Sequence, residues 1–158
     1  MDWKTAAVVA VNRKLVLAAF ADLRKFGMIC RANFSCCMNC AGTEIANDVD
    51  KMPVEKRAEV VGAVFWHRQD EEHLASSGKL MIAYGPVTVY KVGTFGGSVE
   101  SVGKLVAAAL AQKGLVVTWD GNGDTRIEVD LTRDVELARV LDERNWKVAK
   151  SKAFSASA

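Results

Sequence analysis

The chain has 158 residues, of which 50% are hydrophobic and 25% charged, and this is the size and composition of one globular domain with a substantial core. It carries 21 Lys and Arg against 19 Asp and Glu, a net charge of +2. That charge is too small to attract nucleic acid or a lipid surface at long range, so it disfavours a nucleic-acid partner. No stretch approaches the roughly 20 apolar residues of a membrane span, and we expect no membrane partner.

The four cysteines all fall between Cys30 and Cys40. Disulfide-stapled secreted domains carry denser cysteines, spread along the chain, so this distribution favours a reducing compartment and a cytoplasmic location. The first 21 residues are rather apolar, but Asn12, Arg13 and Lys14 interrupt them. We therefore expect a helix that is retained, not a signal peptide.

The spacing of apolar residues predicts a single α/β domain over residues 1–146, followed by a flexible tail at 147–158. Expected helices, in chain order, are residues 3–26, 43–49, 55–59, 69–77, 99–113 with Ser98 as its N-cap, and 134–144. Expected strands are residues 28–34, 60–66, 80–84, 115–119 and 125–131, with a further edge strand at 87–92 and a loose loop at 93–97. The architecture is a mixed sheet of about five strands flanked by helices. Its last two strands form a C-terminal β-hairpin across the turn-rich residues 120–124.

Cysteines follow the first predicted strand directly, at a strand-to-helix corner. Cys37 and Cys40 have the C-x-x-C spacing that lets two thiolates reach one tetrahedral ion, and Cys36 or Cys30 with His67 would complete a zinc site. The same pair at a helix start also fits a redox site, since the helix N-terminus lowers a thiol pKa. A third interpretation is that these cysteines are small buried apolar residues of a packed corner.

His67 and Asp70 lie just past the end of the second predicted strand, where open α/β sheets commonly bind ligands. A histidine and a carboxylate there are candidate catalytic residues, a general base and an acid. The alternative is structural, because acidic residues favour the start of a helix, and Gln69 and Asp70 would then be caps. Farther along, Trp119 with Arg126 across the hairpin would line a stacking surface or form the edge of the core.

A set of short motifs runs from about Val16 to Leu131. In order these are F-x-C-C-x-x-C ending at Cys40, H-x-Q-D ending at Asp70, A-Y-G at 83–85, and G-L-x-V-x-W-D-G at 114–121 followed by Arg126 and Ile127. As a set they resemble a bacterial and phage-borne domain family of unknown function. The chain departs from that pattern with Met38 and Asn39 inside the thiol motif, and with Ala41 where glycine is expected.

The resemblance implies one shared pocket but no activity. Its candidate residues are Cys36, Cys37, Cys40, His67, Gln69, Asp70, Tyr84 and Trp119. We therefore expect a binding or interaction module that holds a small ligand or a partner protein through the cysteine corner and the His67–Asp70 edge. The alternative is a small zinc-dependent or thiol-dependent enzyme at the same place. The sequence leaves open whether the protein is a homo-oligomer.

Overall fold

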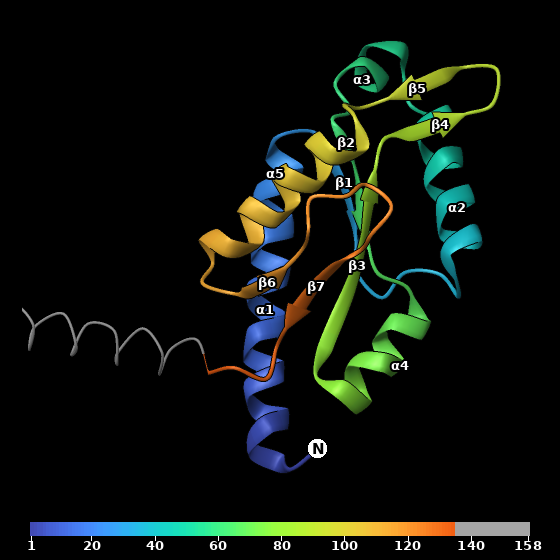
Figure 1. Cartoon of the computed structure of the whole chain (residues 1–158). Coiled ribbons are helices and arrows are strands. Elements are labelled where there is room, and N and C mark those ends of the chain that lie inside the picture. The colour runs from blue at the N-terminus through green and yellow to red at the C-terminus, as the bar shows by residue number, and fades with distance from the viewer. Residues whose placement is uncertain (135–158) are drawn as a thin grey trace, which may run out of the picture.

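The computed structural model describes residues 1–134 and contains the helices and strands of a mixed α/β domain (Figure 1). The helices are α1 (Trp3–Lys25), α2 (Met38–Asp50), α3 (Val54–Ala58), α4 (Arg68–Ser77) and α5 (Val99–Gln112). The strands are β1 (Met28–Arg31), β2 (Gly62–Phe65), β3 (Lys79–Gly85), β4 (Val87–Val89), β5 (Gly93–Phe95), β6 (Val116–Thr118) and β7 (Ile127–Asp130). The predicted helix at 134–144, beyond its first residue, and the predicted tail at 147–158 lie outside the described residues.

The main sheet has five strands in the order β1-β2-β3-β7-β6. Strands β1 and β2 are parallel, and every other neighbouring pair is antiparallel. This confirms the predicted mixed sheet, with β6 and β7 as its C-terminal hairpin. The expected strand at 87–92 is present as β4 at Val87–Val89, but it does not join the main sheet, and the expected loop at 93–97 is wrong because β5 pairs with β4 in a separate two-stranded sheet. The hydroxyls of Thr88 and Thr94 face each other across that pair at 3.1 Å.

Helices cover both faces of the sheet, and the alternation of side chains along each strand divides the core in two. In Figure 1, α1 and α5 lie on one face and α2 lies on the other. In β1, Met28 and Cys30 belong to the larger core on the α1 side, whereas Ile29 joins the smaller core under α2. Helix α4 packs against β3, with Leu74 in the larger core. Within residues 1–134, no helix has the length and apolarity to cross a bilayer.

The corner after β1 is longer, and α2 begins earlier, than the sequence pattern predicts. Strand β1 ends at Arg31, not at residue 34, because Asn33 and Ser35 have left-handed backbones, with φ of 47° and 67°. A strand cannot continue through that conformation. Helix α2 then starts at Met38, not at residue 43, with Cys37 as its N-cap. The thiols therefore sit at the first turn of a helix.

Two helices carry an internal glycine, with opposite surroundings. A Cβ on Gly103 of α5 would lie 2.6 Å from the ring of Trp119 and 2.7 Å from that of Tyr84, so only glycine lets these rings pack on the helix. A Cβ on Gly42 of α2 would have no atom within 4 Å. Packing within the described residues thus requires a glycine at 103 but not at 42.

The two alanine variants should shift stability in opposite directions. Gly42→Ala should raise the free energy of unfolding by about 0.5–1 kcal/mol, because a helical alanine loses less backbone entropy than glycine. Gly103→Ala should lower it by about 1–3 kcal/mol, because the methyl group overpacks the contact with Trp119 and Tyr84. Urea denaturation followed by circular dichroism measures both. The same sign for both variants would contradict this packing.

Candidate functional site

The corner that carries the cysteines is fixed to the corner that follows β2. Because β1 and β2 are parallel, both chains leave the sheet at the same edge. The backbone N–H of Phe34 donates to the carbonyl of Trp66 at 2.9 Å, and the N–H of Arg68 donates to the carbonyl of Ser35 at 3.1 Å. These bonds continue the pairing beyond the strands. The starts of α2 and α4 therefore lie at the same edge of the sheet.

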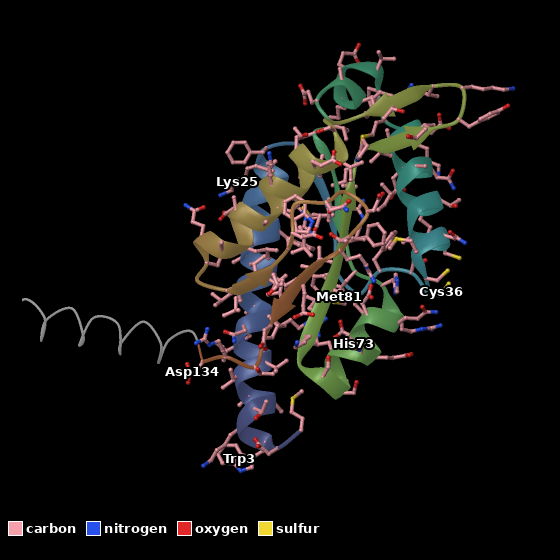
Figure 2. The ribbon with its side chains drawn as sticks, viewed as in Figure 1. Trp3, Lys25, Cys36, His73, Met81 and Asp134 are labelled. Atoms are coloured by element: carbon pink, nitrogen blue, oxygen red, sulfur yellow. The ribbon has the colours of Figure 1, made fainter. Side chains whose placement is uncertain are left out.

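Three thiols gather at the start of α2. The sulfur atoms of Cys36, Cys37 and Cys40 all lie within 4.8 Å of one another, and those of Cys36 and Cys37 are 3.8 Å apart. In a tetrahedral zinc site, Zn–S bonds of about 2.3 Å place two sulfurs about 3.8 Å apart. Cys36 and Cys40 are exposed, and Figure 2 shows Cys36 at the outer edge of the molecule. The cluster has the ligand atoms and spacing to hold a metal ion.

The thiols of Cys37 and Cys40 differ in acidity. The backbone N–H of Cys40, and then the thiols of Cys40 and Cys36, donate to the Cys37 sulfur and lower the pKa of Cys37. Hydrogen bonds to Cys36 and Cys37 hold the proton on Cys40 and raise its pKa to about 11. Cys37 is therefore the more nucleophilic of the two at neutral pH, and a metal ion would displace the proton of Cys40.

Cys30 does not belong to this cluster. Its side chain is fully buried in the larger core, on the α1 side of the sheet. Burial raises its pKa to about 12. One interpretation of the sequence expected all the cysteines of this corner to be small buried core residues. That interpretation holds for Cys30 but not for the exposed Cys36 and Cys40.

His67 is the N-cap of α4 and is not in the sulfur cluster of the described residues. Its Nδ1 accepts from the backbone N–H of Asp70 at 3.4 Å, and Asp70 in return accepts from the N–H of His67 at 3.0 Å. This is a reciprocal capping box. Both side chains are buried, at about 6% exposure, whereas Gln69 beside them is exposed. The capping role foreseen for Asp70 is present.

Arg126 joins the first turn of α4 to the start of β7. Its guanidinium donates to both carboxylate oxygens of Asp70, at 2.7 and 2.6 Å, and to the carbonyl of Met81 at 3.3 Å. The predicted neighbour Trp119 lies elsewhere, against Tyr84. Their rings meet edge to face at 5.5 Å, and the Trp119 Nε1–H donates to the Tyr84 hydroxyl at 2.7 Å. The expected single pocket is thus divided among the thiols, the capping box and this aromatic pair.

Two residues that shape the thiol corner are absent from the predicted site. Asn33 and Ser35 turn the chain through left-handed backbone conformations, and the Ser35 hydroxyl also donates to Glu44 on α2 at 3.1 Å. Asn33 gives a weak sequence signal, since asparagine adopts this conformation more readily than most residues. Ser35 gives none.

A family model described as "Domain of unknown function (DUF6891)" matches residues 10–134. This agrees with the resemblance to a family of unknown function seen in the motifs between Val16 and Leu131. No curated protein matches the chain, and neither does any solved structure.

The cysteines should react with iodoacetamide in a fixed order. In metal-free, reduced protein we expect Cys37 to be alkylated before Cys40 near neutral pH, because its lowered pKa leaves more thiolate at that pH. Cys40 should follow only as the pH approaches about 11, and Cys30 should stay unmodified in folded protein. Tryptic mapping with fragment sequencing measures this order. Faster labelling of Cys40 than of Cys37 would contradict it.

Removal of Arg126 should destabilise the fold. Arg126→Met leaves the buried carboxylate of Asp70 without its cation, and such a loss costs about 3 kcal/mol. The matched control is Asp70→Asn/Arg126→Met, which removes the stranded charge while keeping an oxygen for the cap. It should be more stable than Arg126→Met alone in urea. If Arg126→Met lowers the free energy of unfolding by less than about 0.5 kcal/mol, the Arg126–Asp70 ion pair contributes no more than an exposed pair does, and the prediction is wrong.

Proposed function

Since the chain belongs to this family of unknown function, we propose a function from its geometry: it is a small metal-binding module that holds a zinc ion with Cys36, Cys37 and Cys40. The observation that carries the proposal is the gathering of three sulfur atoms within 4.8 Å at the first turn of α2. Thiolates are soft ligands that select zinc among the common divalent cations of the cell. Within residues 1–134 this is the one group of three or more such ligands at metal-binding distance.

The three-thiolate set leaves a fourth coordination position for another molecule. Structural zinc sites usually have four protein ligands, whereas sites with three keep an open position. His67 does not supply the fourth, because it is buried and engaged in the cap of α4. Cys36 and Cys40 are exposed, so a small ligand or a side chain from a partner protein can reach the ion. This is the binding or interaction role that the sequence suggests.

The start of α2 suits the charge of such a site. Three thiolates around Zn²⁺ carry a net charge of −1, and the positive end of a helix dipole stabilises a negative group. Cys37 is the N-cap of α2, so its sulfur lies at this positive end of the helix. The backbone N–H of Cys40 already favours the Cys37 thiolate, as the lowered pKa indicates.

A second function, thiol–disulfide exchange, is favoured by the unequal acidity of Cys37 and Cys40. The Cys37 thiolate would attack a disulfide of another protein and form a mixed disulfide. Cys40 would then lose its proton and displace the second thiol. The net change is a Cys37–Cys40 disulfide and two reduced thiols on the partner, so electrons balance without another reagent.

Zinc content separates these functions. Protein purified under reducing conditions and reloaded after chelation should contain one zinc per chain by elemental analysis. Cys37→Ser and Cys40→Ser should each weaken binding by at least about ten-fold, since a hydroxyl is a poor ligand for zinc. The matched control is Cys30→Ala, which removes a thiol outside the cluster and should retain the metal. Bound zinc should also protect Cys37 from iodoacetamide.

Two outcomes would contradict the metal proposal. One is no zinc above the level found in a Cys36→Ser/Cys37→Ser/Cys40→Ser variant. The other is equal loss of zinc from Cys30→Ala and Cys37→Ser. If zinc does not bind, and incubation with an oxidised dithiol produces a disulfide between Cys37 and Cys40, thiol exchange is the better account.

A further inference from the structure

A cleft of about 640 Å³ opens between α2 and the end of β3. Its origin lies in the sheet. Strand β7 pairs with β3 only from Lys79 to Ile82, and the chain before β7 turns away, so one edge of β3 lacks a neighbouring strand from Ala83 onward. Helix α2 packs over the face of the sheet next to this open edge of β3. The space left between them has the volume of a small-molecule site.

The walls of this cleft are firmly held. Buried side chains of β2 and β3 line its inner part, Ala63, Phe65 and Ala83. The loop that closes the far side is tied down by the Tyr84 hydroxyl, which donates to the carbonyl of Asn122 at 3.0 Å or of Thr125 at 2.6 Å. The cleft is therefore preformed, with an apolar interior that includes two of the smallest side chains.

Gly42 gives independent support for an occupant. It lies in the α2 wall of the cleft, and a Cβ there would meet no atom within 4 Å. A glycine inside a helix costs about 0.5–1 kcal/mol relative to alanine. Packing in the described residues gives no reason for that cost. Close approach of a bound molecule to the backbone of α2 does.

The charged residues that line the cleft, Arg126 and Asp124, point to the class of ligand. Arg126 lines the cleft with a side chain that is 29% exposed. The charge of the guanidinium is already offset by the carboxylate of Asp70. The site therefore offers a hydrogen-bond donor with little net charge, which suits an uncharged acceptor such as a carbonyl oxygen better than a phosphate or a carboxylate.

We propose that this cleft binds an uncharged small molecule with a flat apolar body and a carbonyl-type acceptor, the body lying over Ala63 and Ala83 and the acceptor bonded to Arg126. The proposal is independent of the zinc site. Met38 and Asn39 line the cleft, but none of the three clustered cysteines does. The thiols and the cleft thus lie on different sides of the first turns of α2, and each can be tested without the other.

The probe for this site is Prodan, an uncharged naphthalene ketone whose fluorescence shifts to the blue in an apolar environment. The full chain should bind it saturably with one site per chain. Gly42→Leu should weaken that binding by at least about ten-fold, because the new side chain occupies the cleft. The matched control is Asn47→Leu, an exposed position of the same helix that does not line the cleft, and it should bind Prodan as the unaltered protein does.

A second cleft variant and an NMR measurement test the same proposal independently. Thr43→Phe, at an exposed lining position, replaces Gly42→Leu if circular dichroism shows that the leucine variant does not fold. In ¹⁵N NMR spectra, the Nε–H signal of Arg126 should shift on Prodan binding. That of Arg57, which already donates to the carbonyl of Met52 at 2.9 Å, should not.

The proposal is overturned if Prodan shows no saturable binding, or if Gly42→Leu and Asn47→Leu bind it equally well. An unshifted Arg126 signal at saturation overturns the assigned ligand class. Cys37→Ser and Cys40→Ser should leave Prodan binding unchanged, so failure of the zinc proposal does not affect this result.

Discussion

Two backbone hydrogen bonds between loops hold the candidate site together. They join Phe34 to Trp66 and Ser35 to Arg68, beyond the ends of the parallel strands β1 and β2. Side chains can be exchanged at these positions while the bonds remain, because only main-chain atoms take part. Their effect is to fix where α2 and α4 begin. The thiol cluster stands at one of these two helix starts, so the bonds determine where its sulfur atoms lie on the sheet edge.

The same edge of the sheet presents two helix starts with different chemistry. At α4, the side chains of His67 and Asp70 are buried and satisfy the backbone, and Arg126 neutralises the carboxylate. At α2, the N-cap is Cys37, and two of the three clustered thiols are exposed. One helix start is therefore closed by its own residues, and the other keeps its ligand atoms available. This contrast favours the thiol corner as the place of function and gives the histidine a structural role.

Much of the fold could be predicted from residue patterns. The apolar spacing of α1 and α5, the continuous apolar run of β2 and the turn-rich segment before β7 indicated their elements correctly, because each pattern is local. The end of β1 was placed too late. Alternation of polar and apolar residues continued through Asn33, whereas the left-handed backbone there and at Ser35 depends on bonds to a loop more than thirty positions away. Strand β4 lies within the predicted strand at 87–92, whereas β5 was missed because it has three residues, is mostly exposed and carries little periodicity.

The candidate site was predictable only in part, for a related reason. Spacing alone brings Cys37 and Cys40 together at a helix start, and it does so here with Cys36. Which way His67 points is decided by the capping box and by Arg126, a partner 56 positions from Asp70. The cleft beside α2 could not be foreseen, because it arises where β7 diverges from β3. Its one local trace is Gly42, a glycine inside a helical pattern.

The central claim is that three thiolates of one helix start share a metal ion. X-ray absorption at the zinc edge of the loaded protein tests it most directly, because it counts the atoms bonded to the metal and identifies them. The account predicts three sulfur neighbours at about 2.3 Å and one lighter ligand of oxygen or nitrogen. A first shell made only of oxygen and nitrogen, or one with a single sulfur, would contradict it.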